Sequence, residues 1–583
     1  MKLSLSPRAC TALLAFASAL HGETITVDFT TVKHPLNPLT FSMVESGYGA
    51  GGTELPNQPA QQTAINNLNV AMMRMNLGYK TPGDPNSGIV CMASGASQTI
   101  TGDQWINAIK ASGAAPEIRV QMKVGQESFW ATDAANLVKH FNITTGNPVA
   151  RWVVGNEPDG NGLTASAYST GFNSMYDAMK AIDSTIKIGG PAVSFYSTSF
   201  IETFLTNTGT RADFLDYHQY GTGQNSTKTD AQLLSETVNY ETNCNDLRTR
   251  IVTHMGATRA AQVDIEVGEW NVSWATDVRE VEAYNSIWSA STLGHIISTG
   301  AISRQYADKN GPLGALIETS NPTVNGVTYT GAPNDPMPIY HGIGMYTGES
   351  LFSGFGTNIV NTTSTQSLLE VYASSNANNI VVVNKSPSTN YATTVNLTGY
   401  TSGTAAVWQK NGANKTPQHL SSVAIAGGTF SYTFPAYTVT TFVLPSNTLL
   451  YEAETLPVAS SSDTVRVVSD SHYSGGEGII LDANAVNDFV TFTVNVPAAG
   501  TYATSFGMKK NNARGIFQFS SNGVNHGAAQ DEYTSADTFT EVSIGNVVFS
   551  SSGNKSFQFL ITGKNAASSG YSFSLDYIKM VPQ

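Results

Sequence analysis

The sequence predicts an α/β fold, a (β/α)8 TIM barrel with an appended β-sandwich and a C-terminal β jelly-roll module. From about residue 36 to 310, apolar strand-like runs alternate eight times with helical patterns. From about 351 to 445, and again from 449 onwards, short alternating strands take over and the helical period disappears. Regular β/α alternation is typical of parallel barrels, and successive short strands separated by turns are typical of sandwiches and jelly rolls.

The barrel prediction depends on eight apolar or alternating runs, each followed by a turn signal or a helical pattern. A doubly wound open sheet is the structural alternative, because it uses the same alternation of strand and helix. The expected strands are residues 40–43, 71–75, 117–120, 152–154, 186–189, 214–218, 263–267 and 303–306. The expected helices include residues 103–110, 167–182 and 281–298.

The pattern divides the chain into four segments. We expect a signal peptide over 1–22, the barrel over 36–350, the β-sandwich over 23–35 plus 351–446, and the jelly-roll module over 449–583. Only 13 % of the residues are charged, and the net charge of −13 comes without a basic cluster. This composition argues against nucleic acid or an anionic membrane as a partner, and we expect a monomer.

The first 22 residues have the three parts of an export signal. Lys2 and Arg8 give the positive start, residues 9–20 give a short apolar core, and 17–19 (Ala-Ser-Ala) offer a cleavage site. We therefore expect a secreted protein, extracellular or periplasmic. In such a protein Cys91 and Cys244 form either a disulfide or two buried free thiols, and the sequence leaves both open.

Two glutamates stand directly after apolar runs. Glu157 follows the run 152–154 and a glycine, and Glu269 follows the run 263–267 and a glycine. By strand count these are the ends of the fourth and seventh strands. Because functional groups of such barrels lie at the C-terminal ends of the strands, we expect the two carboxylates to share one pocket.

A pair of carboxylates across a pocket is what glycoside hydrolysis requires. A retaining enzyme uses one as acid and base and the other as nucleophile, about 5–5.5 Å apart. We assign Glu157 as the acid/base and Glu269 as the nucleophile. Glu266 competes with Glu269, but residues three apart in a regular strand lie on opposite faces, and Glu269 lies nearer the rim.

Five further residues are candidates for binding the substrate or orienting the carboxylates. Asn156 precedes the acid, and Trp270 follows the nucleophile in a place suited to stacking on a sugar. His218 and Tyr220 end the sixth strand and are positioned to orient Glu269. Arg74, a charge in an apolar strand, needs a buried partner, and Glu269 is the attractive one.

The segment Gly155-Asn156-Glu157-Pro158, with Gly268-Glu269-Trp270 at strand seven, resembles clan A of the glycoside hydrolases. The strand-four motif and the β-sandwich resemble families 79 and 39 most, with family 30 behind. The resemblance covers roughly 36–445 and implies a retaining (β/α)8 barrel. By this resemblance Glu157 is the acid/base, Asn156 is the residue that assists it, and Glu269 is the nucleophile. The resemblance also carries the strand-two arginine onto Arg74 and the residue ending strand six onto His218 or Tyr220.

The C-terminal unit resembles carbohydrate-binding modules of families 6 and 35. The resemblance rests on 451–454 (Tyr-Glu-Ala-Glu), 489–502 and 575–578 (Leu-Asp-Tyr-Ile). It implies a structural Ca²⁺ held by Glu452, Glu454 and Asp576, whose hard oxygen ligands suit that ion. We expect no cofactor for catalysis.

Together these features predict a secreted retaining glycoside hydrolase that cleaves O-glycosidic bonds in a polysaccharide or oligosaccharide, with the C-terminal module targeting it. The alternative is a non-catalytic, lectin-like protein that uses the barrel cleft for binding. Glucuronidase, xylosidase and galactanase-like activities are all compatible with these residues.

Overall fold

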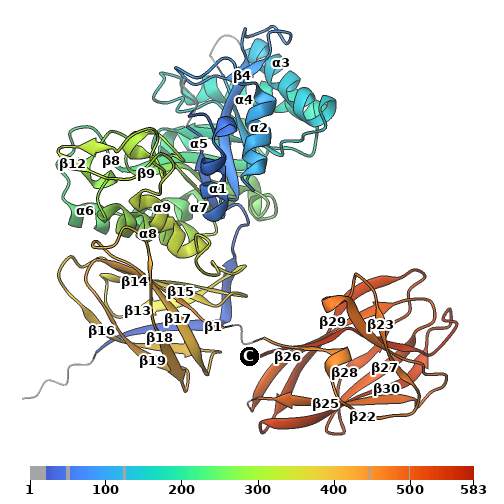
Figure 1. Cartoon of the computed structure of the whole chain (residues 1–583). Helices are drawn as coiled ribbons and strands as arrows, with labels where there is room; N and C mark the ends of the chain where they lie inside the picture. The colour runs from blue at the N-terminus through green and yellow to red at the C-terminus, as the bar shows by residue number, and fades with distance from the viewer. Residues whose placement is uncertain (1–21, 47–52, 123–126, 446–447, 498, 583) are drawn as a thin grey trace, which may run out of the picture.

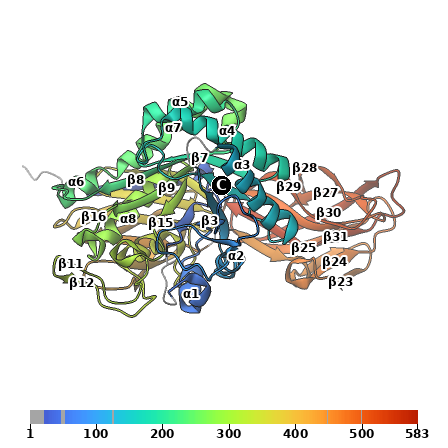
Figure 2. The same ribbon diagram turned by 90° about the horizontal axis from the view of Figure 1, so that it is seen from above.

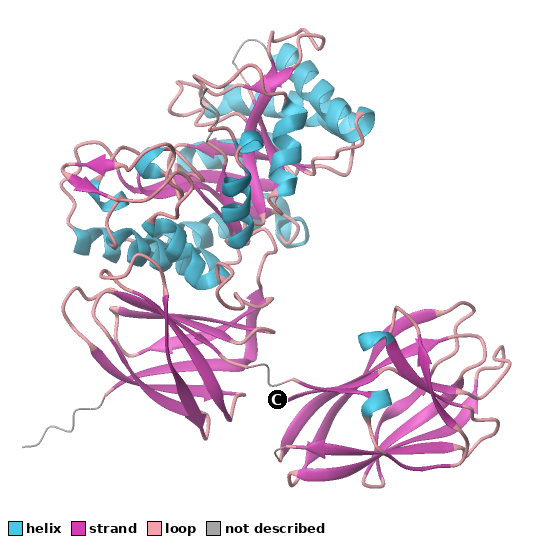
Figure 3. Cartoon of the chain, viewed as in Figure 1, coloured by secondary structure: helices cyan, strands magenta, loops and turns pink. Residues whose placement is uncertain are grey.

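The computed structural model describes residues 22–46, 53–122, 127–445, 448–497 and 499–582 (Figure 1). The predicted signal peptide, apart from Gly22, lies outside the described residues. Among the described residues the α-helices all end by Thr347, and the rest of the chain is built almost wholly of strands (Figure 3). None of the helices among the described residues has the length and apolar character needed to cross a membrane.

Eight parallel strands form a closed barrel, because the first strand pairs with both the second and the last. Each of the eight expected runs is a barrel strand, so the barrel prediction is confirmed and the open sheet is wrong. A short antiparallel strand, β4 (Ile89–Cys91), extends β3 at its end. The barrel strands are β2 (Phe41–Val44), β3 (Met72–Tyr79), β5 (Ala115–Val120), β6 (Arg151–Val154), β7 (Lys187–Val193), β8 (Phe214–Thr222), β9 (Asp264–Ser273) and β10 (Ile302–Gln305).

The helices surround the strands, and α3, α4, α5 and α7 lie together along one side (Figure 2). The local sequence explains where several of them start. At α2, for example, Thr101 and Gln104 form a reciprocal capping box, and Trp105, Ile106 and Ile109 then face the core. The helices are α1 (Pro59–Asn67), α2 (Gly102–Ala111), α3 (Glu127–Val138), α4 (Ala165–Ile182), α5 (Thr198–Thr208), α6 (Asp230–Ser235), α7 (Val238–Ala260), α8 (Tyr284–Ile297) and α9 (Pro338–Thr347).

The second unit is a nine-stranded sheet that closes on itself around its own apolar core. Its first strand, β1 (Glu23–Pro35), pairs antiparallel with β13 and parallel with β16, so the N-terminal strand belongs to this unit and not to the barrel. Helices α8 and α9 of the barrel pack against it. The other strands are β13 (Asn358–Ser364), β14 (Leu369–Ser375), β15 (Asn379–Asn384), β16 (Tyr391–Thr398), β17 (Ser402–Lys410), β18 (Gln418–Ala426), β19 (Thr429–Phe434) and β20 (Thr438–Val443).

A buried charged cluster joins the barrel to this sheet. His295 of α8 contacts Glu241 of α7 at 2.9 Å and Glu370 of β14 at 3.1 Å. Lys385 and the hydroxyl of Ser291 also donate to the Glu370 carboxylate. His295, Glu370 and Lys385 are largely buried, so paired charges help to hold the two units in one orientation.

The third unit, from β21 onwards, is an all-β module with an aromatic core. Phe506 and Phe559 lie at its centre, with ring centroids 4.9 Å apart. Its strands make three sheets: β21 (Leu449–Glu452), β32 (Tyr577–Pro582), β26 (Gly500–Lys510) and β29 (Thr538–Phe549); β22 (Val458–Ser461), β25 (Phe489–Val496), β30 (Gly553–Lys564), β27 (Gly515–Ser521) and β28 (Val524–Asp531); and β23 (Val465–Ser469), β24 (Glu477–Leu481) and β31 (Phe573–Leu575).

The two cysteines among the described residues are free. Cys91 ends β4 and Cys244 lies on α7, and both are buried. Of the two alternatives that the sequence left open, the disulfide is therefore wrong. Burial raises the pKa of each thiol to about 11, so neither is a reactive thiolate at neutral pH.

Candidate active site

Glu157 emerges from the end of β6 on a constrained backbone. Gly155 has a φ of +74°, and Glu157 itself has a φ of +46°, in the left-handed region that residues with a Cβ rarely adopt. The Glu157 amide donates to the carbonyl of Ala192, and its own carbonyl accepts from the Asn161 amide. Such conformations cost about 1–3 kcal/mol and persist where the surroundings enforce them, often at functional sites.

Glu269 is turned into the barrel by an irregularity in β9. On β8, Tyr217 pairs with Val267 and His218 pairs with Glu269, so β9 carries one extra residue at Gly268. The extra residue changes the alternation of the strand, and both Glu266 and Glu269 make their contacts inside the barrel. The expectation that these two glutamates lie on opposite faces is therefore wrong.

The same irregularity corrects the role predicted for Trp270. Its side chain is 0 % exposed and packs outside the strands against Trp288 of α8, and its indole N–H donates to Ser303. Neighbours along a strand point to opposite faces, so a residue directly after an inward Glu269 must point outward. Trp270 is a core residue and does not meet the substrate.

The structure brings three of the other predicted residues, His218, Tyr220 and Arg74, together around the two glutamates. One carboxylate oxygen of Glu157, one of Glu269 and a ring nitrogen of His218 all lie within 4.8 Å of one another. Nδ1 of His218 is 2.9 Å from Glu157 and 3.5 Å from Glu269. The Tyr220 hydroxyl donates to Oε2 of Glu269 at 2.7 Å, and Arg74 donates to Oε1.

These contacts set the charge of Glu269. Burial alone pushes the pKa of this carboxyl up, but the electrostatic effects of His218 and Arg74 and the Tyr220 hydroxyl outweigh it and lower the pKa to about 2. Burial and the neighbouring Glu269 charge raise the pKa of Tyr220, so this hydroxyl stays protonated and remains a donor. Glu269 is thus an ionised, oriented carboxylate at neutral pH, as a nucleophile must be.

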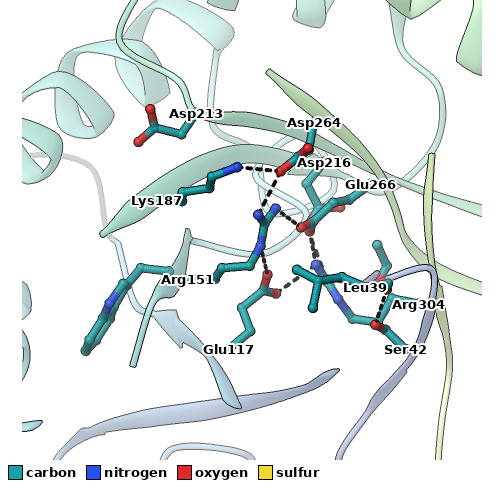
Figure 4. Close-up of polar contacts among 12 residues, drawn as sticks. Leu39, Ser42, Glu117, Arg151, Lys187, Asp213, Asp216, Asp264, Glu266 and Arg304 are labelled. Carbon is teal, nitrogen blue, oxygen red and sulfur yellow. Dashed lines mark hydrogen bonds and ion pairs between the residues drawn. The ribbon is translucent and has the colours of Figure 1, made fainter. Parts of the chain in front are cut away.

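Glu266 has the opposite electrostatics. Glu266 lies in a buried cluster inside the barrel, where Arg151 and Arg304 each contact its carboxylate (Figure 4). Burial and the nearby Glu117 charge raise its pKa. Glu266 is therefore paired with two arginines and has a raised pKa, so the geometry and the electrostatics favour Glu269 over Glu266 as the candidate nucleophile.

The buried cluster also supports the backbone next to Glu269. The guanidinium of Arg304 binds Asp216 at 3.2 Å and the Gly268 carbonyl at 3.1 Å. A Cβ at position 268 would lie 1.8 Å from Oδ1 of Asp216, so only glycine fits there. Glycine therefore permits both the extra residue in β9 and the close approach of the cluster.

A cavity of about 970 Å³ opens over the two glutamates. Its walls come from the ends of β8 and β9 and from the segments that follow β7, β8, β9 and β10, and they include Phe195, Tyr220, Trp274 and Tyr306. The sequence singled out none of Phe195, Trp274 and Tyr306 as a residue of the cavity wall. The pattern that could have indicated Trp274 is the polar and aromatic continuation of the seventh strand beyond Glu269.

Asn156 lies apart from this cavity. It lines a second one, of about 680 Å³, together with Met122, Pro158 and Tyr168. Within the described part of the chain its Oδ1 is buried without a hydrogen-bond partner. A predicted contact with a sugar hydroxyl would satisfy that acceptor, and it stays a prediction.

Two of the three predicted calcium ligands, Glu452 and Asp576, contact the same residue of the third unit, Ser474. The Ser474 amide donates to Asp576 at 3.0 Å, and its hydroxyl donates to Glu452 at 2.8 Å. Burial and the charges of Glu452 and Glu454 raise the pKa of Asp576 to about 6. Among the described residues, Oε2 of Glu452 and Oε2 of Glu454 are buried with no hydrogen-bond partner, so the donor set fits a hard cation.

Comparison with known proteins agrees with this geometry. Residues 125–301 match the model of glycosyl hydrolases family 39, a span that contains both Glu157 and Glu269. No curated protein matches the chain. The match confirms the predicted clan A resemblance for the barrel.

Solved structures share the fold of the barrel and the second unit. The α-L-arabinofuranosidase of Thermotoga maritima is 17 % identical with a TM-score of 0.58, and the alignment covers 72 % of this chain and 100 % of that one. CelM2, a bifunctional glucanase-xylanase from a metagenome library, is 17 % identical with a TM-score of 0.54 over 73 % and 99 %. A family 44 xyloglucanase of Paenibacillus polymyxa is 14 % identical with a TM-score of 0.53 over 72 % and 99 %.

Proposed function

We propose that this O-glycoside hydrolase retains the anomeric configuration of its substrate, with Glu157 as acid/base and Glu269 as nucleophile. The observation that carries the proposal is the spacing of the two carboxylates, whose nearest oxygens lie within 4.8 Å. Retaining enzymes need about 5–5.5 Å between the two groups, whereas inverting enzymes leave room for a water at about 6.5–9.5 Å.

In the first step Glu269 attacks the anomeric carbon and the bond to the leaving oxygen breaks. Glu157, whose side chain is one-third exposed, gives its proton to that oxygen. Arg74 and Tyr220 bind the two oxygens of Glu269, which keeps this carboxylate ionised and fixes its orientation. The product is a glycosyl ester of Glu269. His218, which contacts both carboxylates, positions them relative to each other.

In the second step a water replaces the leaving group. Glu157, now a carboxylate, takes a proton from the water, whose oxygen attacks the anomeric carbon as the ester bond to Glu269 breaks. The two inversions give net retention. The low pKa of Glu269 makes it a good leaving group in this step.

For the substrate we propose a polysaccharide or oligosaccharide. The solved structures with this fold are described as an arabinofuranosidase, a glucanase-xylanase and a xyloglucanase, which supports a polymer with neutral sugars. The export signal in the first 22 residues supports secretion, and we propose that the enzyme acts as a monomer on substrate outside the cell.

For the third unit we propose a carbohydrate-binding module that keeps the enzyme near its polymer, stabilised by Ca²⁺ on Glu452, Glu454 and Asp576. The two unpartnered, buried carboxylate oxygens support the ion, because buried charges without partners are costly. Glu452 and Glu454 lie near the start of the module and Asp576 near its end, so Ca²⁺ would connect the two ends.

Azide rescue tests the roles of the two glutamates. In Glu157→Ala, azide should restore turnover of an activated glycoside and give a glycosyl azide with the configuration of the substrate. In Glu269→Ala, azide should give the inverted azide. Asp177→Asn, an exposed acid far from the site, is the control. Exchanged configurations would reverse the assignment, and sugar binding without any turnover by the wild type would favour the lectin-like alternative.

A further inference from the structure

The side chains that line the cavity over Glu157 and Glu269 are more buried at its floor than at its mouth. Glu269, at the floor, is 6 % exposed, and one-third of the Glu157 side chain is exposed. Trp274 and Phe195 line the same cavity and are 57 % and 61 % exposed. Large aromatic side chains that remain exposed beside a buried catalytic pair leave apolar surface in water where a substrate would cover it.

Trp274 is held in place from one side. Its indole lies against Gly223, where a Cβ would come within 2.0 Å of Nε1, and its amide donates to the Thr222 carbonyl at 3.3 Å. The loop that carries Gly223 is fixed in turn, because Arg279 donates to the Lys228 carbonyl at 3.0 Å. The ring is therefore supported on one side before any ligand binds, and a supported side chain loses less entropy on binding.

Phe195 is tied to the loop that carries the acid. The amide and hydroxyl of its neighbour Ser194 donate to the Asp159 carboxylate at 2.9 and 2.8 Å, two residues after Glu157. The position of Phe195 is thus linked to that of Glu157 through a short run of backbone. An aromatic side chain fixed in this way is suited to contact the part of the substrate that Glu157 protonates.

We propose that Trp274 and Phe195 form a subsite for the sugar unit on the leaving-group side of the cleaved bond. This proposal rests on the retaining hydrolase proposed above and goes further, because it assigns two residues of this chain to the sugar that leaves. The chemistry favours a pyranose whose face presents axial C–H groups, since aromatic rings bind such apolar faces by contact and area burial. Gln224 and Ser226 of the same wall offer polar groups to its hydroxyls.

The gradient of exposure places this subsite on the leaving-group side. The sugar that is attacked must reach Glu269 at the floor, and the oxygen that is protonated must lie at Glu157. The next sugar along the chain then lies farther out, where Trp274 and Phe195 line the mouth. Binding energy from that sugar can be used in the transition state, so losing the subsite should lower kcat as well as affinity.

The test compares two substrates of the same glycone. A glycosyl fluoride has a leaving group that reaches no subsite, and a disaccharide has one that does. For Trp274→Ala we expect kcat/KM on the disaccharide to fall about tenfold and on the fluoride to stay within about twofold, the size of one aromatic contact. Trp274→Tyr should restore most of the loss. Phe195→Ala should show the same selectivity, and Val252→Ala, an exposed apolar residue on α7, should change neither rate.

A second readout uses the reverse of the leaving-group step. With the fluoride as donor and an unreactive glycoside as acceptor, Trp274→Ala should form less transfer product relative to hydrolysis than the wild type. Equal losses on fluoride and disaccharide, or no loss on either, would overturn the subsite. A wild type that turns over neither the fluoride nor any glycoside would instead overturn the hydrolase itself.

Discussion

The hydroxyl of Tyr220 lies 2.7 Å from Oε2 of Glu269, while Arg74 donates to the other oxygen of the same carboxylate. The two strands involved, β8 and β9, are neighbours, and the extra residue at Gly268 brings Glu269 opposite His218. A nucleophile with both oxygens bound by donors is fixed in direction and kept ionised. The charge of Glu269, on β9, therefore depends on Arg74 of β3 and on Tyr220 of β8.

Tyr220→Phe removes one of those donors. We expect the pKa of Glu269 to rise, because the hydroxyl is one of the groups that lower it. Less of the nucleophile is then ionised in acid, so the acidic limb of the kcat/KM profile should move to higher pH, and kcat should fall about 10- to 100-fold. A pH–rate profile measures both effects. Tyr340→Phe, whose hydroxyl donates to the Ala64 carbonyl, is the control, and an unmoved acidic limb would contradict the role of Tyr220.

Gly268→Ala tests the fit between β9 and the buried cluster. The new methyl group would meet Asp216 at 1.8 Å, so either the strand or the cluster must shift. We expect a loss of about 1–3 kcal/mol in the free energy of unfolding, as for other overpacked sites. Activity should fall at the same time, because Glu269 is the next residue. Thermal unfolding and kinetics measure the two losses; Gly563→Ala, in open space, should change neither.

The junction between the barrel and the second unit predicts a pH dependence of stability. Burial alone lowers the pKa of His295, but its bonds to Glu241 and Glu370 raise it to about 9 from 6.5. Burial alone raises the pKa of Glu370, but His295 and Lys385 lower it to about 2 from 4.5. The contribution of His295 is therefore complete below pH 6.5 and lost towards 9. That of Glu370 is complete above pH 4.5 and lost towards 2.

Glu370→Gln leaves His295 and Lys385 without their shared partner. We expect it to cost about 3–5 kcal/mol near pH 5.5, as when one member of a buried pair is removed. Unfolding followed by denaturant titration from pH 4 to 9 gives the profile. Asp482→Asn, which breaks an exposed pair with Arg466, should cost less than about 1 kcal/mol. A flat profile for the wild type would show that this junction contributes no stability.

Removing Ca²⁺ tests the predicted ion site. After treatment of the full chain with a chelator, calorimetric titration with Ca²⁺ should show a binding site that Glu454→Gln weakens strongly. The thermal transition of the module should rise with added Ca²⁺, because a ligand that binds the folded state stabilises it. Asp537→Asn, an exposed acid of the same module that pairs with Lys509, is the control. Equal binding by wild type and Glu454→Gln would place the ion elsewhere.

Much of the architecture follows from sequence periodicity. All eight barrel strands were predictable because each is a buried run bounded by turn signals, and the positions of Glu157 and Glu269 followed from counting strands. What could not be predicted came from contacts between distant residues. The extra residue at Gly268 depends on Asp216 and Arg304, and without it the side to which Trp270 points could not be known.

The cysteines and the cavity show the same limit. Cys91 and Cys244 could be paired or free until their places on β4 and α7 were known. Trp274 and Phe195 became candidates for sugar contact only when the walls of the cavity were seen, because an exposed aromatic and a core aromatic look alike in a sequence. Local pattern predicts strands and the ends of strands, whereas side-chain direction is decided by packing.

The central claim is that Glu269 forms a covalent bond to the sugar. A 2-deoxy-2-fluoro glycosyl fluoride of an accepted sugar should inactivate the enzyme, and mass spectrometry of the digested protein should place the label on the peptide that contains Glu269. An ester on Glu157 or Glu266, or the absence of any adduct together with a product of inverted configuration, would contradict the account.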